Sequence, residues 1–320
     1  MRKNVKNTIN PFMIIVCILL AVYAFTMIFV LIWGLNTSLK HYSDFGNPER
    51  NVLGLPNLEI WKLVAQKKPG QNIFSNYVTV IENLEIVSRE SFYTMWSDEA
   101  VVHSNRANLF DLVWNTISYA IFSAILQAIL PCIMGYLCSK YSYKFSDFIY
   151  AFLLIQMMIP IIGTYPAELA LLKSLGLYDT LIGNLIQKMS FTGVYFFIFY
   201  AYFKGIPDSY IEAAEVDGAS QFRIMITIML PLAIKTISTV ALLKFVHFWN
   251  DYTVAVLYLP TRPTLAYAIY YLGVAGKGQA FSGAPARVAA SMFLALPILI
   301  VFVVLKDKLM GNVSMGGVKG

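Results

Sequence analysis

Charged residues are scarce in this chain, since only 13% of its 320 residues are Asp, Glu, Lys or Arg. A typical soluble domain carries about 25%. Hydrophobic residues make up 58% of the chain, a balance typical of membrane proteins. The net charge of +6 comes without the basic patch that nucleic-acid binding needs. We therefore expect a chain embedded in a lipid bilayer, with no nucleic-acid partner.

Cysteine and histidine are also rare. The three cysteines lie inside apolar runs, which argues against a disulfide framework. The three histidines are far apart and lack metal-ligand spacing, so no metal site is expected. A phosphate-binding loop is missing as well, because Gly276-Lys277-Gly278 lacks the upstream glycine and the following Ser or Thr. The chain is expected to bind no cofactor of its own and not to be an enzyme.

Long apolar runs, in contrast, are abundant. A spanning helix needs about 20 mostly apolar residues. On this basis the sequence predicts an all-α membrane protein with six transmembrane helices. They are expected at Phe12 to Trp33, Leu112 to Leu137, Phe148 to Gly163, Phe191 to Phe203, Leu232 to Leu259 and Val288 to Leu305. The fourth is the weakest, because Lys188 interrupts its apolar run. The first is longer than the apolar core of a signal peptide and is predicted to be an uncleaved anchor.

Basic residues in the short loops predict the orientation of these helices. The excess of basic residues in the loops on one side of the membrane places both termini in the cytoplasm, together with the segment from Lys204 to Leu230. The predicted division is a cytoplasmic N-terminus (1–11), a first transmembrane helix (12–35), an enlarged extracytoplasmic segment (36–110), a transmembrane domain (111–305) and a cytoplasmic tail (306–320). The extracytoplasmic segment mixes turn residues with a strand-like run from Tyr77 to Ile81, which indicates a small folded cap.

The segment between the fourth and fifth spans predicts a short helix, a break and a second helix. Pro207 suits the first turn of a helix, and Asp208 or Ser209 can cap it. Asp217-Gly218 is a turn signal, and Pro231 marks where the next element begins.

This short helix has a slim surface, since Ala213 and Ala214 carry small side chains. Small residues allow a close approach to a groove on a soluble partner, and Glu212 and Glu215 offer charge-assisted hydrogen bonds at its rim. From the residues alone, a solvated amphipathic helix is the alternative interpretation.

The spacing of this segment resembles a known pattern. Glu212-Ala213-Ala214, three residues, Gly218, nine residues and then Ile228-x-Leu230-Pro231 resembles the signature cytoplasmic loop of ABC importer permeases. Further likenesses to the carbohydrate branch of that family are Ile206-Pro207, Asp217-Gly218-Ala219-Ser220, Leu175-Gly176-Leu177 with Thr180, and Phe245 followed by Trp249-Asn250-Asp251. The last five residues, Gly316 to Gly320, look like the end of the maltose-type second permease.

The resemblance implies a permease subunit that forms half of a sugar or oligosaccharide pathway in the cytoplasmic membrane of a prokaryote. Its implied partners are a second homologous permease, two cytoplasmic ATPases that carry ATP and Mg, and an extracytoplasmic solute-binding protein. The residues implied in ATPase coupling are Glu212, Ala213, Ala214, Asp217, Gly218 and Pro231, with Gly317, Val318 and Lys319 of the tail reaching the ATPase interface. The long segment 36–110 departs from the family's usual short loop.

Polar side chains at membrane depth are the candidates for the solute pathway, because burying them in lipid is costly. They are Gln127, Gln156, Lys244, Trp249, Asn250 and Asp251. Lys244, His247 or Phe248, and Asp251 are expected on one face of the fifth helix. The alternative is that these side chains make packing bonds to the companion permease.

Other functions remain as alternatives. The solute of such a permease could be something other than a sugar. An ion-coupled secondary transporter would show inverted repeats, and none is found. A membrane enzyme would show clustered acid–base or metal groups, whereas only single polar residues appear. The Glu-Ala-Ala loop argues against both the secondary transporter and the enzyme.

Overall fold

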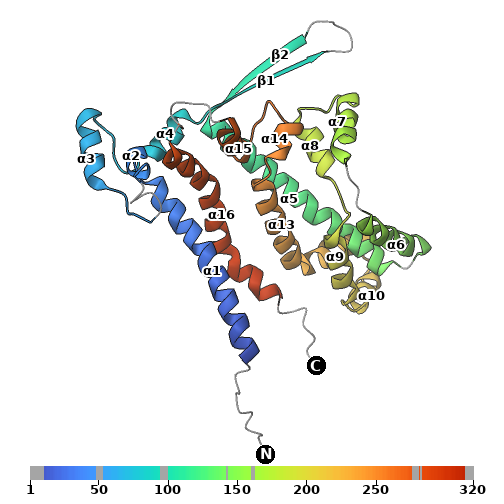
Figure 1. Ribbon diagram of the computed structural model, residues 1–320. Helices are drawn as coiled ribbons and strands as arrows, with labels where there is room; N and C mark the ends of the chain where they lie inside the picture. Colours follow the sequence, from blue (N-terminus) through green and yellow to red (C-terminus); the bar gives the residue numbers. More distant parts are fainter. Residues whose placement is uncertain are drawn as a thin grey trace, which may run out of the picture. The chain divides into compact units, whose positions relative to one another are not determined.

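The computed structural model describes residues 11–47, 53–93, 100–141, 143–159, 163–275, 281 and 283–313. These residues are mostly helical and include one two-stranded antiparallel sheet (Figure 1). The chain divides into two compact units. Unit 1 holds residues 1–84 and 272–295, and unit 2 holds residues 85–271 and 296–320.

Unit 1 contains α1 (Pro11–Ser38), the first part of α16 (Ala284–Val313), and three short helices that follow α1. These are α2 (Tyr42–Phe45), α3 (Leu58–Lys67) and α4 (Ser75–Asn83). The most apolar stretch of α1 has no buried residue, whereas its last turn is buried. A helix that is apolar on all sides needs an apolar medium around it. Lipid therefore fits the exposed part of α1.

The short helices of unit 1 close the C-terminal end of α1. The Trp61 indole N–H donates to the Leu39 carbonyl (3.1 Å), and the Asn76 amide donates to the carbonyls of Ser38 (2.7 Å) and Lys40 (2.8 Å). The last carbonyls of a helix have no partner within it, so the Asn76 amide satisfies one such group at Ser38. The bonds to Leu39 and Lys40 fix the chain directly after the helix. The predicted folded cap thus has a physical basis in the end of α1.

The strand predicted from Tyr77 to Ile81 is wrong, because these residues lie within α4. Val80 is fully buried, and Tyr77 reaches back to form a 2.7 Å hydrogen bond with Ser38. Both contacts need the spacing of a helix, so packing overrides the β propensity of the residues.

Unit 2 contains the sheet that the all-α prediction did not include. Strand β1 (Ile86–Tyr93) pairs with β2 (Ala100–Ala107), and its register runs from Ile86 opposite Ala107 to Tyr93 opposite Ala100. The helices of this unit outside residues 205–233 are α5 (Leu109–Lys140), α6 (Lys144–Met158), α7 (Thr164–Ser174), α8 (Leu181–Lys188), α9 (Val194–Lys204), α13 (Ile234–Trp249), α14 (Thr253–Leu257), most of α15 (Leu265–Ala275) and the second part of α16.

Helix α5 is the centre of unit 2, since α9 and α13 both pack along it. Its N-terminus carries a capping box between Asn108 and Asp111. Gly135 lets α9 approach closely: an added Cβ atom would lie 2.8 Å from the backbone nitrogen of Tyr200. Small residues at helix contacts are typical of membrane proteins, where close packing replaces the hydrophobic effect.

Three described helices are long and apolar enough to cross a membrane, namely α1, α5 and residues 284–304 of α16. A fourth span results if residues 221–232 and 234–249, which bend by 70° at Ala233, count together. The apolar part of α6 and all of α9 are shorter. These findings establish an apolar helical chain but leave the count of six spans as a prediction.

The predicted fifth helix from Leu232 to Leu259 is wrong as a single helix. Helix α13 ends at Trp249, where the Asn250 amide donates to the Val246 carbonyl (2.8 Å) and ends the helical pattern. A separate short helix, α14, follows. The third helix also ends earlier than predicted, at Met158.

Candidate functional site

The signature segment folds as a short helix, α10 (Ser209–Val216), that ends in a glycine turn. Gly218 has a φ of +77°. Its N–H donates to the Glu215 carbonyl, and the next N–H, of Ala219, donates to the Ala214 carbonyl, both at 2.9 Å. This pair of bonds is the Schellman motif, which ends a helix on a left-handed residue. The predicted helix and turn are therefore present.

Helix α10 has an exposed face and a buried face. Glu212, Ala213 and Asp217 are exposed, and Val216 is 88% exposed. Ala214, in contrast, is only 7% exposed and belongs to a core formed with residues of α5, α9 and α13. The two alanines thus have different places: Ala213 leaves the outer face slim, and Ala214 lets α10 lie close to the core.

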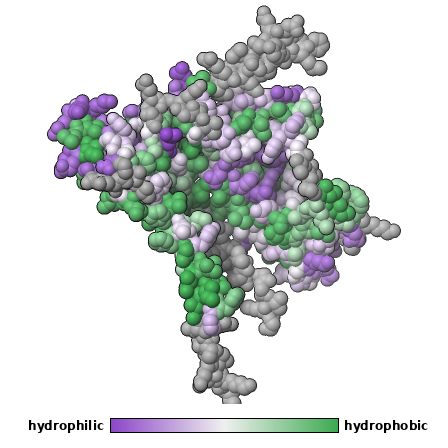
Figure 2. Space-filling view, in the orientation of Figure 1, coloured by the Kyte–Doolittle hydropathy of each residue, from purple (hydrophilic) through white to green (hydrophobic). Residues whose placement is uncertain are grey.

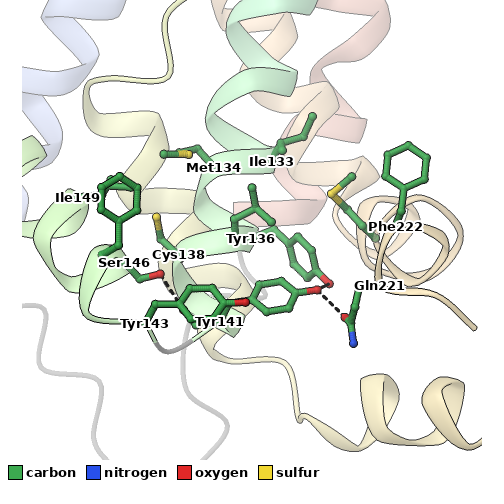
Figure 3. A pocket seen from close by; sticks show the side chains of 13 residues that line it. Ile133, Met134, Tyr136, Cys138, Tyr141, Tyr143, Ser146, Ile149, Gln221 and Phe222 are labelled. Atoms are coloured by element: carbon green, nitrogen blue, oxygen red, sulfur yellow. Dashed lines mark hydrogen bonds between the residues drawn. The ribbon is translucent and has the colours of Figure 1, made fainter.

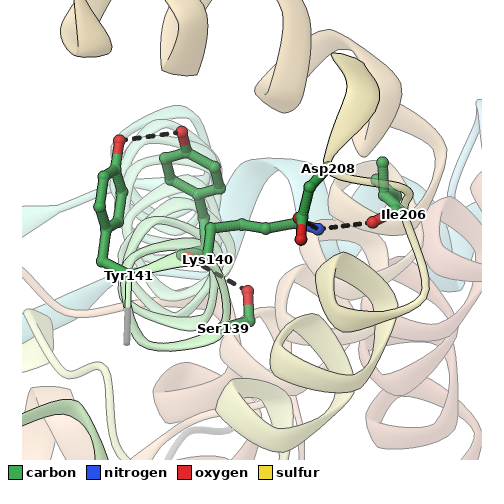
Figure 4. Close-up of polar contacts among 6 residues, drawn as sticks. Ser139, Lys140, Tyr141, Ile206 and Asp208 are labelled. Atoms are coloured by element: carbon green, nitrogen blue, oxygen red, sulfur yellow. Dashed lines mark hydrogen bonds and ion pairs between the residues drawn. The ribbon is translucent and has the colours of Figure 1, made fainter. Parts of the chain in front are cut away.

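Lys140, the last residue of α5, holds the chain just before α10 (Figure 4). Its ammonium donates to the Ile206 carbonyl (2.5 Å) and to the Asp208 carboxylate (2.6 Å). The Lys140 side chain is 4% exposed and that of Asp208 is 73% exposed. Asp208 occupies the predicted capping position but makes no capping bond with its side chain. This contact could not be predicted from the sequence, because Lys140 and Asp208 are 68 residues apart.

A second link between α5 and α10 is a chain of polar side chains (Figure 3). The hydroxyls of Tyr136 and Tyr141 lie 3.3 Å apart, and the Tyr141 hydroxyl donates to the Gln221 amide oxygen (2.6 Å). The Gln221 amide nitrogen in turn donates to the Glu215 carboxylate on α10. Tyr136, Tyr141 and Gln221 border an apolar groove of about 600 Å³ between α5, α6 and the segment after α10. Side chains thus connect the exposed helix to the long central one.

The second half of the segment leads into α13 through a bend. It consists of α11 (Gln221–Ile224), a five-residue π-helix (Met225–Met229) and α12 (Leu230–Leu232). Pro231 has no N–H to donate and its ring crowds the preceding turn, which favours an irregular helix before it. The carbonyl of Leu232, at the bend, accepts a 2.6 Å hydrogen bond from the Tyr202 hydroxyl. Pro231 lies at the start of α12, and the next long helix begins at Ile234, two residues after the predicted start at Leu232.

In the structure, the predicted pathway residues make separate local contacts. The Gln127 amide donates to the Lys188 carbonyl (3.2 Å). Trp249 is 5% exposed, and its ring packs against Phe245 at 5.6 Å. The buried Gln156 amide oxygen has no hydrogen-bond partner among the described residues.

Asp251 does not share a helical face with Lys244, because α13 ends two residues before Asp251. Its carboxylate accepts hydrogen bonds from the Tyr119 hydroxyl (2.8 Å) and from the backbone N–H of Thr253 (2.9 Å). The ammonium of Lys244 lies 4.9 Å from the centre of the Tyr195 ring. Gly317, Val318 and Lys319, the predicted tail contacts, lie outside the described residues.

Replacing Gly218 with alanine is expected to lower the free energy of unfolding by about 1 kcal/mol, since a left-handed backbone costs other residues about that much. An added Cβ atom would meet nothing within 4 Å, so backbone strain is the whole effect. Thermal unfolding of the purified protein in detergent measures it. Gly218→Asn is the control, because asparagine tolerates this conformation better. An alanine variant as stable as the parent would contradict the expectation.

Comparison with known proteins places these features in a family. The family model described as "Binding-protein-dependent transport system inner membrane component" matches residues 127–313. A putative ABC transporter permease protein of Caldicellulosiruptor sp. is 27% identical over 82% of this chain and 95% of its own length. The melibiose/raffinose/stachyose import permease protein MelC of Bacillus subtilis is 26% identical over 67% of this chain and 78% of its own length.

The fold is also similar to a solved one. A chain of a bacterial ABC transporter that imports the acidic polysaccharide alginate matches with a TM-score of 0.67 and 20% identity, over 92% of this chain and 95% of that one. The family match covers more than half of the 320 residues and includes α10, its glycine turn and the bend into α13. The chain belongs to the family of binding-protein-dependent transport system inner membrane components, the permeases of ABC importers.

Proposed function

We propose that this chain is the permease subunit of an ABC importer for a sugar or oligosaccharide and forms half of its translocation pathway. The names of its relatives support the solute class, since they include permeases for melibiose and raffinose, diacetylchitobiose, arabinooligosaccharides and trehalose. Family membership argues against the ion-coupled alternative, because ATP rather than an ion gradient drives ABC importers.

The observation that carries this proposal is the two-faced helix α10. Its exposed face, with Glu212, Ala213 and Val216, is the surface that docks into a groove of the ATPase. Its buried face, with Ala214, moves together with the core of unit 2. Closure of the ATPase pair on ATP then shifts α10 and the packed helices as one body, which is how packed elements transmit rigid motion.

The proposed membrane arrangement has six spans: α1, α5, α6, α9, α13 and α16. Helices α6 and α9 are short for a bilayer, at 15 and 11 residues. Both termini and α10 lie in the cytoplasm, and residues 36–110 lie outside. The host membrane is the cytoplasmic membrane of a prokaryote.

The proposed partners are a second homologous permease, two ATPase subunits that bind ATP and Mg, and an extracytoplasmic solute-binding protein. Gly218 and Asp217 shape the end of the docking helix, and Pro231 shapes the bend behind it. Gly317, Val318 and Lys319 of the tail reach the ATPase interface. Gln127, Gln156, Lys244, Trp249, Asn250 and Asp251 remain the proposed pathway residues.

Replacing Glu212 with alanine tests the docking role. We expect the variant to co-purify with less ATPase subunit than the parent and to lose most ATP-driven transport in proteoliposomes, because a charge-assisted bond at the rim contributes about 1.5–3 kcal/mol. Gly218→Pro should have the larger effect, since proline cannot adopt a φ of +77°. Quantitative co-purification and solute uptake are the two measurements.

Glu59→Ala is the matched control, because Glu59 is an exposed glutamate on α3, which the proposal places on the other side of the membrane. It should leave both the association and the transport unchanged. The docking role of α10 would be refuted if both variants, Glu212→Ala and Gly218→Pro, transported solute at the full ATP-coupled rate and co-purified with a normal amount of ATPase subunit.

A further inference from the structure

Two lysines of unit 2 lie near the same turn of α13. Lys244 lies within α13, and the ammonium of Lys188, the last residue of α8, is 5.9 Å from the ring centre of Phe248, one turn after Lys244. Both lysines are half-buried. Among the described residues, neither ammonium has a carboxylate within 4.0 Å. Figure 2 shows hydrophilic residues gathered in the middle of unit 2, with hydrophobic surface around them.

Aromatic rings rather than acids lie next to these ammonium groups. The Lys244 ammonium is 4.9 Å from the centre of the Tyr195 ring, and the Lys188 ammonium is 5.9 Å from that of Phe248. A cation over an aromatic face is attracted to it, but the ring does not neutralise the charge. The ring contacts therefore hold the two side chains in place and leave their hydrogen-bond donors available.

The nearby carboxylates are already bound to neutral donors. Asp251 accepts from the Tyr119 hydroxyl and from backbone N–H groups. Glu168 accepts from the Gln187 amide (2.6 Å) and from the Tyr258 hydroxyl (2.8 Å). Burial would raise the pKa of Glu168, but these hydrogen bonds and the charge of Lys188 outweigh it and hold the pKa below its ordinary value.

A lysine near the centre of a membrane helix costs about 2.5–3.5 kcal/mol on insertion scales. A second cation beside it adds repulsion. Such a pair is expected to serve a function, and an anion that binds between the two ammonium groups removes both costs.

We infer that Lys188 and Lys244 form a binding site for a carboxylate of the transported solute, which makes that solute an acidic, uronate-containing oligosaccharide. This inference rests on the proposed function, since it assigns the solute class of that pathway. The aromatic rings of Tyr195 and Phe248 supply apolar faces beside the cations. A chain of sugar rings with carboxylate groups offers both kinds of contact in one molecule.

The test uses the whole importer complex, this chain with its companion permease and two ATPases, in nanodiscs of phosphatidylcholine. The probes are trigalacturonate and its trimethyl ester, which keeps the same chain of sugar rings and lacks the three negative charges. Calorimetry should show that the acid binds about tenfold more tightly, the size of one charge-assisted hydrogen bond. Lys188→Gln and Lys244→Gln should each remove most of this preference, and Lys244→Arg should keep it.

Lys235→Gln is the matched control, because Lys235 is an exposed lysine on the same helix, α13, and should not change the preference. Equal binding of the two probes, or no binding of the acid, overturns the inference. A preference for the acid that survives in the variant lacking both lysines also overturns the inference. So does a preference for the acid that is lost when phosphatidylglycerol is added, because the anion that the lysines bind would then be a lipid headgroup.

Two readouts separate this inference from the proposed function. A chain that fails to assemble with the ATPases refutes the proposed function. An assembled complex that hydrolyses ATP but binds acid and ester equally refutes only the assignment of an acidic solute.

Discussion

A Lys140→Met variant is expected to hydrolyse ATP with its partner subunits but to transport solute at least about tenfold more slowly than the parent. The Lys140 ammonium bonds both the Ile206 carbonyl and the Asp208 carboxylate, directly before α10. Methionine keeps most of the length of the side chain and removes both bonds. The bond to the Ile206 carbonyl contributes about 1.5–3 kcal/mol because its donor is charged, and the bond to the exposed Asp208 carboxylate contributes below about 1 kcal/mol. The segment that leads into α10 would then move independently of α5.

Asp208→Asn is the matched control for this prediction. The Asp208 side chain is 73% exposed, so solvent screens its pairing with Lys140, and the loss should be below about 1 kcal/mol. The bond from Lys140 to the Ile206 carbonyl persists in that variant. The ratio of solute taken up to ATP hydrolysed in proteoliposomes is the measurement. An unchanged ratio in Lys140→Met would show that α5 does not take part in coupling.

The second large effect is expected from Gly135→Ala, which should lower the free energy of unfolding by about 1–3 kcal/mol. The new methyl group would lie 2.8 Å from both the Cβ atom of Phe199 and the backbone nitrogen of Tyr200. Backbone atoms cannot rotate away, so α5 and α9 must separate. Thermal unfolding and the yield of monodisperse protein in detergent would report the change.

Gly273→Ala provides the comparison for Gly135→Ala. Gly273 also lies within a helix, α15, but an added Cβ atom there meets nothing within 4 Å. Alanine favours a helix over glycine by roughly 1 kcal/mol, so this variant should be as stable as the parent or more stable. Equal stability of the two variants would show that Gly135 is not needed for the approach of α9.

Features that depend on a continuous run of residues could be predicted from the sequence. The apolar runs that form α1, α5 and α16 are long and nearly uncharged. All three form helices that are long and apolar enough to cross a membrane. The helix, turn and second helix around Gly218 were also predicted, because a glycine turn and its flanking residues act locally. The permease family followed from the same segment and is confirmed by the match over residues 127–313.

Features that depend on distant residues could not be predicted. The end of α13 at Trp249 follows from bonds made by Asn250 and Asp251, and one of these reaches Tyr119, 132 residues away. The β-branched run in α4 becomes helical because Val80 packs into a core that the local sequence does not reveal. Lys140 could be counted as a basic loop residue, but its bond to Asp208 depends on the tertiary fold.

Helix α1 illustrates how unevenly the fold constrains its residues. Its most apolar stretch has no buried position, whereas Gly34, Thr37 and Ser38 in its last turns are buried. Over most of its length, almost any nonpolar side chain would therefore satisfy the surrounding lipid, and random exchange among Leu, Ile, Val and Phe should be tolerated. Sequence drift among descendants of this gene is expected to be fast in about the first six turns, at 3.6 residues per turn, and to slow abruptly at Gly34.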